Sequence, residues 1–263
     1  AIKLTFTDGS ALELLNAGSA ASTHVVAVPG AGGEQGITGT SVNQAPGDVD
    51  FGTAATVLGV EWHSAADFLA DGLSMSASFS TDSGAAKAAA ARLENSWGVG
   101  ATYVTSAGDT AVTLGGGISG GEIATTGSQS SADKAGFNIG VSAVTGDLTI
   151  GLGYGDGDTF RPNAVGNDAN EQTDGSVMKA GIKYVTGDIT LALGVSAGEG
   201  KDSDFGSTAT TDDSTDSTSA SVTYAVASGV SAVVGYTTVD AQNDGASSTD
   251  DGSAWYVGAT MSF

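Results

Sequence analysis

Apolar residues alternate with small polar residues along most of this chain, from about residue 54 to the end. In the segment LSMSASFS, Leu73, Met75, Ala77 and Phe79 share one face, and four serines share the other. A repeat of two residues is the pattern of a β-strand with one apolar and one polar face. About eleven such segments follow residue 54 and one precedes it, so the sequence predicts an all-β protein of about twelve strands.

Short and long connections alternate between the predicted strands. The short ones contain glycine, which supplies the positive φ of a tight hairpin turn; they are SAGD (106–109), TGD (145–147), TGD (186–188) and ASG (227–229). The long ones are polar and span about residues 81–94, 120–134, 155–174, 198–216 and 240–251. Because this unit repeats about every 40 residues, it predicts an antiparallel up-and-down meander with all long loops at one end.

The apolar strand faces allow two interpretations. In a soluble sandwich or small barrel they point inward and form a dry core, whereas in a membrane barrel they point outward to lipid and enclose a polar interior. The opposite faces carry mainly Ser, Thr and Gly, and about a dozen meandering strands exceed what a sandwich needs. Both features favour the membrane barrel. The competing soluble core would bury Leu152, Leu191 and Val234 together.

Aromatic residues of the apolar faces supply a third argument, because they gather near the strand ends. Near the short turns lie Trp62, Tyr103, Tyr184, Tyr224 and Phe263, and near the long loops lie Phe79, Trp97, Phe137 and Trp255. Two aromatic belts with smaller aliphatic side chains between them are typical of membrane barrels, where the rings lie at the lipid–water interfaces. We therefore expect these residues to form two girdles.

Composition and charge narrow the function classes. Only 14% of the 263 residues are charged, against about 25% in ordinary soluble domains. The net charge is −22, because 30 acidic residues outnumber 8 basic ones, and this balance leaves no basic surface for nucleic acid. The acids concentrate in the long loops, so we expect one strongly negative end. Two histidines in weak contexts and no cysteine give little support for catalysis, so we expect no enzyme.

Two stretches resemble a known family. The last residues, GSAWYVGATMSF, resemble the C-terminal strand of Gram-negative outer-membrane barrels, in which the barrel-assembly machinery reads the terminal aromatic residue, here Phe263. Residues 56–84, TVLGVEWHSAADFLADGLSMSASFSTDSG, resemble the hairpin after the pore-constricting loop of general diffusion porins, particularly the alphaproteobacterial type. On this resemblance AIKLTF is the strand before that loop, and residues 16–52 are the constriction loop.

The resemblance implies a single transmembrane antiparallel β-barrel domain over residues 1–263, located in the bacterial outer membrane. Porins of this family have 16 strands, so either the chain lacks the first strands or it closes as a smaller barrel of 12 to 14 strands. The implied function is passive diffusion of ions and small hydrophilic solutes, in a homotrimer surrounded by lipid and lipopolysaccharide. The alternative is a barrel without a channel, which acts as a surface anchor or adhesin through acidic, cation-binding loops.

The resemblance and the strand parity together give the candidate pore residues. In the family, acids on the constriction loop face basic residues on the wall, and such opposed charges set ion preference. The loop candidates are Glu34, Asp48 and Asp50. The wall candidates, on strand faces away from lipid, are Lys3, Glu61, His63, Lys179 and Lys183.

Carboxylates in the long loops offer a separate kind of site. Oxygen atoms of this type are the ligands that Ca²⁺ and Mg²⁺ prefer, and the candidates are Asp156, Asp158, Asp212 and Asp213. Neither the stretch with Asp156 and Asp158 nor the stretch with Asp212 and Asp213 has the 12-residue EF-hand spacing with its closing Glu. We therefore expect no cofactor, and at most divalent cations that bridge loop acids to lipopolysaccharide phosphates.

Overall fold

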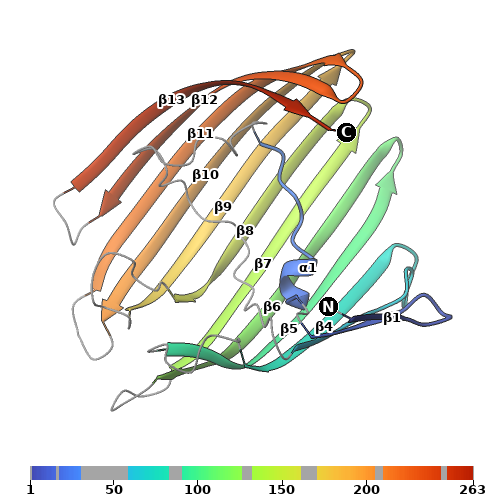
Figure 1. The fold of residues 1–263 in the computed structure, drawn as a ribbon, viewed down its shortest axis with the longest axis vertical. Helices are drawn as coiled ribbons and strands as arrows, with labels where there is room; N and C mark the ends of the chain where they lie inside the picture. Colours follow the sequence, from blue (N-terminus) through green and yellow to red (C-terminus); the bar gives the residue numbers. More distant parts are fainter. Residues whose placement is uncertain are drawn as a thin grey trace.

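Thirteen antiparallel strands, each hydrogen-bonded to the next along the chain, form one curved sheet in the computed structural model (Figure 1). The structure describes residues 2–15, 18–30, 59–82, 91–125, 132–160, 171–204, 210–243 and 248–262. The predicted all-β meander is confirmed. The elements in chain order are β1 (Ile2–Thr5), β2 (Ala11–Leu14), α1 (Ala20–Thr23), β3 (Gly59–His63), β4 (Leu73–Asp82), β5 (Ala91–Ala107), β6 (Thr110–Thr125), β7 (Ala132–Thr145), β8 (Leu148–Phe160), β9 (Glu171–Thr186), β10 (Ile189–Asp204), β11 (Thr210–Ala227), β12 (Val230–Asn243) and β13 (Ser248–Met261).

The first hairpin adds a strand that the sequence did not predict. After β1 the chain turns at Gly9, whose φ is 89°, and returns as β2. The Asp8 carboxylate accepts hydrogen bonds from the hydroxyl of Ser10 at 2.7 Å and from its backbone N–H at 2.9 Å. These bonds, the hydroxyl first, hold the pKa of Asp8 below its ordinary value. β2 escaped prediction because four residues are too few to show an alternating pattern.

The four glycine turns form as predicted. Gly108, Gly146, Gly187 and Gly229 have φ values of 62°, 55°, 57° and 76°, a region that other residues enter only with strain. Each turn joins two strands that pair from the residues next to the turn, as Thr145 does with Leu148. The four turns therefore lie at one end of the sheet (Figure 1).

At the opposite end the strands extend well beyond their predicted limits. β8 continues to Phe160 and β10 to Asp204, so the long connections are shorter than the sequence indicated. Hydrophobic alternation could not reveal these extensions, because both faces of a strand are polar where it leaves the apolar band. The backbone pairing nevertheless continues there, for example between Gly198 and Thr215.

The large apolar side chains point away from the concave side of the sheet. Leu152, Leu191 and Val234 are 52%, 42% and 43% exposed, so the soluble-core interpretation is wrong. The small polar side chains between them lie on the concave face, where Ser76 and Ser119 are each 2% exposed. The sheet is thus apolar outside and polar inside, as in a membrane barrel.

The edges of the sheet are β1 and β13. Within the described residues these two strands do not pair with each other, and they run in the same direction because twelve antiparallel steps separate them. No helix in the described parts of the chain is long and apolar enough to cross a membrane.

Candidate functional site

A short segment of the chain, residues 18–30, lies against the concave face of the sheet. It contains α1 and an extended stretch that runs across the strands rather than along them (Figure 1). Ala20 and Ala21 are 0% and 1% exposed, and Val26 is 7% exposed. Val25 packs against the inward-facing Val177 of β9. We call this stretch the internal segment; it belongs to residues 16–52, which the sequence predicted as the constriction loop.

Glycines on the inner wall make room for the internal segment. A Cβ atom on Gly117 would lie 2.5 Å from Cα of Ala21, and one on Gly151 would lie 2.5 Å from Cδ of Pro29. Side chains cannot approach so closely, so these positions require glycine. We call the glycines under the segment the glycine track: Gly98, Gly100, Gly115, Gly117, Gly140, Gly151, Gly181 and Gly194.

Hydrogen bonds from the wall hold α1 in place. The backbone N–H of Ala20 donates to Ser78 Oγ at 2.9 Å. On the other side, Asn138 Nδ2 donates to the carbonyl oxygen of Ala21 at 3.2 Å. The Thr23 hydroxyl donates to Glu61 Oε1 at 2.7 Å. The first two bonds satisfy backbone groups that a helix of four residues leaves unpaired.

His24 ends α1 and joins the segment to two wall hydroxyls. Its Nδ1 lies 2.7 Å from Thr102 Oγ1, and its Nε2 lies 2.9 Å from Ser76 Oγ. Burial lowers the pKa of His24, and the nearby His63 lowers it further, so the ring is neutral. A neutral imidazole donates from one nitrogen and accepts at the other, which suits two hydroxyl partners.

A cluster of charged side chains lies beside this network on β1 to β3. Register places Lys3 opposite Glu13, and Glu13 opposite Glu61. Lys3 Nζ lies 3.0 Å from Glu13 Oε1, and His63 Nε2 lies 3.6 Å from the same oxygen. His63 Nδ1 reaches Ser76 Oγ at 3.0 Å and lies 3.9 Å from Glu61 Oε1. The structure thus brings together three predicted wall residues and adds Glu13.

The other two predicted wall residues lie on β9, several strands away. Lys179 is in register with Gly153 and Lys183 with Thr149, while Met178 and Tyr184, which flank the two lysines in the chain, are exposed on the outer face. Both lysines therefore occupy the inner face. The predicted loop acids Glu34, Asp48 and Asp50 lie outside the described residues.

Most of the predicted girdle residues are exposed on the outer face: Phe79, Trp97, Tyr103, Phe137, Tyr184, Tyr224 and Trp255. Trp62 is half-buried because it contacts Phe68 edge-on at 5.5 Å between ring centroids. Two tyrosines that the sequence analysis left out of the girdle pack beside it. Tyr154 lies 5.8 Å from Phe137 and Tyr236 lies 4.5 Å from Trp255. Phe263 lies outside the described residues.

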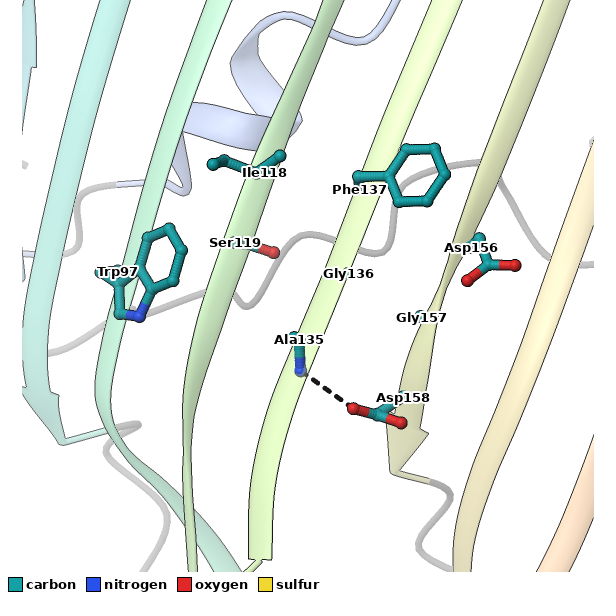
Figure 2. A pocket seen from close by; sticks show the side chains of 9 residues that line it. All are labelled: Trp97, Ile118, Ser119, Ala135, Gly136, Phe137, Asp156, Gly157 and Asp158. Carbon is teal, nitrogen blue, oxygen red and sulfur yellow. Dashed lines mark hydrogen bonds between the residues drawn. The ribbon is translucent and has the colours of Figure 1, made fainter.

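The predicted loop carboxylates belong to strands instead. Asp156 and Asp158 lie in β8, and Asp212 and Asp213 lie in β11. Figure 2 shows Asp156 and Asp158 at one side of a shallow groove of about 380 Å³, opposite Trp97. Asp156 accepts a hydrogen bond from the Tyr154 hydroxyl at 3.0 Å, and Asp158 accepts one from the backbone N–H of Ala135 at 3.1 Å. Among the described residues, metal-ligand side chains converge elsewhere, at Glu13, Glu61 and His63.

Several residues of this site were missed by sequence reasoning. Glu13 sits on a strand that was not predicted, while Ser76 and Thr102 look like ordinary polar-face residues. His24 lies within residues 16–52, for which the sequence predicts only a loop. One signal was available: glycines recur on the polar faces of β5 and β6 at Gly98, Gly100, Gly115 and Gly117. So many missing side chains on one face indicate that backbone packs there.

Solved structures with a similar fold are outer-membrane proteins. A porin refined at 1.8 Å resolution is 18% identical, with a TM-score of 0.56 over 97% of this chain and 77% of the porin. In-vitro folded OmpT of Vibrio cholerae is 15% identical, with a TM-score of 0.56 over 97% and 77%. DcaP, an outer membrane channel of Acinetobacter baumannii, is 13% identical, with a TM-score of 0.54 over 83% and 67%. At such identities these likenesses show the fold.

Comparison of sequences gives the family. None of the curated proteins matches the chain. The family model described as Gram-negative porin, in contrast, matches residues 15–244, which is most of the chain. The outward apolar face, the polar interior and the strand meander all agree with that match. The chain therefore belongs to the Gram-negative porin family and is a β-barrel protein of the bacterial outer membrane.

Proposed function

We propose that the barrel is a passive diffusion channel for ions and small hydrophilic solutes. The observation that carries this proposal is the contrast between the two faces of the sheet. Apolar side chains such as Leu152 are exposed outside, whereas serines, glycines and charged residues such as Lys183 lie inside. A wall of this kind holds water, and solutes cross it down their gradients without a chemical step.

The internal segment supplies the narrowing in this proposal. It occupies space on the inner wall from β4 to β10, and residues 16–52 as a whole act as the constriction loop. Lys3, Glu61, His63, Lys179 and Lys183 form the wall side of the passage, and Glu34, Asp48 and Asp50 form the loop side. Opposed charges at a narrow point select ions by sign.

The acidic end of the barrel gives the channel a weak cation preference. The chain carries 30 acidic and 8 basic residues, and many acids lie at the ends of β8, β10 and β11 that are opposite to the short turns. Negative potential at a pore mouth raises the local concentration of cations. Divalent cations bound to Asp156, Asp158, Asp212 or Asp213 would bridge the barrel to phosphates of neighbouring lipopolysaccharide.

The remaining parts of the proposal concern assembly. The protein forms a homotrimer, its subfamily is the alphaproteobacterial general diffusion type, and residues 1–263 make one domain. The barrel-assembly machinery recognises the C-terminal strand through Phe263. Support comes from membership of the porin family and from the likeness of the end GSAWYVGATMSF to other outer-membrane barrels.

Conductance in planar bilayers tests the proposal. We expect stable open steps, in groups of three, and a reversal potential in a salt gradient that favours cations. Lys179→Glu together with Lys183→Glu should increase the cation preference, because two positive charges on the inner face become negative. A folded protein that never conducts would overturn the channel and favour the surface anchor or adhesin. A reversal potential that favours anions would overturn the proposed selectivity alone.

A further inference from the structure

We propose that Glu13, Glu61 and His63 form a binding site for a divalent transition metal of the Zn²⁺ type on the inner wall. One ligand atom from each residue lies within 4.8 Å of the other two. The residues belong to β2 and β3, which pair in register with Glu13 opposite Glu61 and Ala11 opposite His63. The site is separate from the acidic strand ends, and it stands whether or not the barrel conducts.

The orientation of His63 is that of a metal ligand. Its Nδ1 lies 3.0 Å from Ser76 Oγ, so Nδ1–H can donate and leave the lone pair of Nε2 free. Nε2 is buried and finds no hydrogen-bond partner among the described residues. It lies 3.6 Å from Glu13 Oε1. Two ligands on a tetrahedral Zn²⁺ are about 3.4 Å apart, because each lies about 2.1 Å from the ion.

Ser76 is itself fixed by the second histidine. Its Oγ lies 2.9 Å from Nε2 of His24, which is neutral, so the Ser76 hydroxyl can donate to His24 while it accepts from His63. A hydrogen-bonded partner on the far nitrogen of a ligating imidazole is the usual support of a metal site. A tautomer that leaves His63 Nε2 ready for a metal is therefore compatible with both contacts of Ser76.

Glu61 supplies the charge that a cation would neutralise. Its side chain is 2% exposed, and its Oε1 accepts one hydrogen bond from Thr23. A buried carboxylate is costly unless it is paired or coordinates a metal. The ammonium of Lys3 lies against Glu13, so one lysine faces two carboxylates and a negative charge remains.

Access and ligand type favour Zn²⁺ over Ca²⁺. The side chains of Glu13 and His63 are each 22% exposed, so an ion can approach them from the interior of the barrel, and it reaches the buried Nε2 when the Glu13 side chain moves aside. A side-chain shift of about 1 Å would bring Glu61 to coordination distance, and water would complete four ligands. Imidazole suits Zn²⁺ and Co²⁺, whereas Ca²⁺ prefers six or more oxygen ligands.

A Co²⁺ titration of the folded barrel in detergent tests the site, with Ca²⁺ in excess so that ordinary acidic sites are filled. The visible absorption of Co²⁺ reports nitrogen ligation and a coordination number of four or five. We expect one Co²⁺ per chain, displaced by Zn²⁺ and not by Ca²⁺. A spectrum of hexa-aquo Co²⁺ at all concentrations, or full displacement by Ca²⁺, would overturn the proposal.

Point variants test whether Co²⁺ binding depends on this site and not on other carboxylates of the protein. His63→Gln and Glu13→Gln should each weaken Co²⁺ binding about tenfold or more, since each removes a ligand. The matched control is Glu199→Gln on β10, which removes a carboxylate several strands away from the site; binding should change by no more than about threefold. Equal loss in the Glu13 and Glu199 variants, or no loss in the His63 variant, would contradict the assignment.

A variant that should bind metal more tightly gives a test that misfolding cannot imitate. Lys3→Met takes away the ammonium that competes for Glu13, and Lys3 is 58% exposed, so the barrel should tolerate the change. We expect Co²⁺ to bind severalfold more tightly to this variant than to the natural protein. Unchanged or weaker binding would show that Glu13 is not a ligand.

Discussion

Neighbouring residues on the same strand face different surroundings in this barrel. Trp97 and Phe137 point outward into lipid, while Gly98 and Asn138, next to them in the chain, face the internal segment. The outer face is specified by the size and type of its side chains. The inner face between β5 and β10 is specified largely by their absence, because another piece of backbone fills the space.

The two faces should therefore respond to mutation in opposite ways. Lipid is a uniform apolar solvent, so the outer face tolerates changes of shape but not of charge. The glycine track contacts the internal segment at close range. The inner face there should therefore tolerate a change of polarity but not a larger side chain. Three experiments test this contrast, from the largest expected effect to the smallest.

An outward charge should have the largest effect. Leu152→Arg places a guanidinium between the two aromatic belts and should lower the free energy of unfolding by about 2–4 kcal/mol. Thr190→Arg, on the inner face of β10, is the control and should cost less than about 1 kcal/mol. Urea unfolding in lipid vesicles measures both. Equal losses in the two variants would mean that the faces do not meet different solvents.

One added methyl group on the glycine track should have the second-largest effect on stability. Gly117→Ala would place Cβ 2.5 Å from Cα of Ala21, and overpacking of this kind costs about 1–3 kcal/mol. Gly258→Ala is the matched control on the inner face of β13, where the new Cβ would meet Val233 Cγ1 at 3.6 Å. The same unfolding measurement should find the control unchanged. A Gly117 variant as stable as the natural protein would show that the segment does not rest on this wall.

Aromatic packing within one belt should give the smallest effect. The rings of Tyr236 and Trp255 lie 4.5 Å apart at 42°, and a double-mutant cycle with alanine should give a coupling of about 0.5–1.5 kcal/mol. A cycle between Trp255 and Tyr184, on strands that are not neighbours, should show additive losses. Coupling of the same size in both cycles would contradict a local ring contact.

The sequence predicted the features that depend only on residues close together in the chain, such as strand faces and tight turns. The exposed positions of Leu152 and Val234 follow from a period of two, and the turns at Gly146 and Gly187 follow from glycine between strands. These features are local, so a window of a few residues contains them. The family likewise agrees with the resemblance of residues 56–84 to a porin hairpin and of the last strand to outer-membrane barrels.

The site was harder to predict because its contacts join distant parts of the chain. His24 meets Ser76 and Thr102 only after the sheet has curved, and no pattern near residue 24 specifies either partner. The long-loop ends were misjudged for a different reason. Strands such as β8 continue beyond the apolar band, where hydrogen bonding persists but hydrophobic contrast disappears.

The glycine track also fixes an order of events during biogenesis. The internal segment is synthesised before the strands that receive it, and its last described residue, Gly30, lies against Gly194 of β10. Residues 18–30 must therefore stay undocked until most of the sheet has formed, and their docking is a late step that closes contacts between remote parts of the chain.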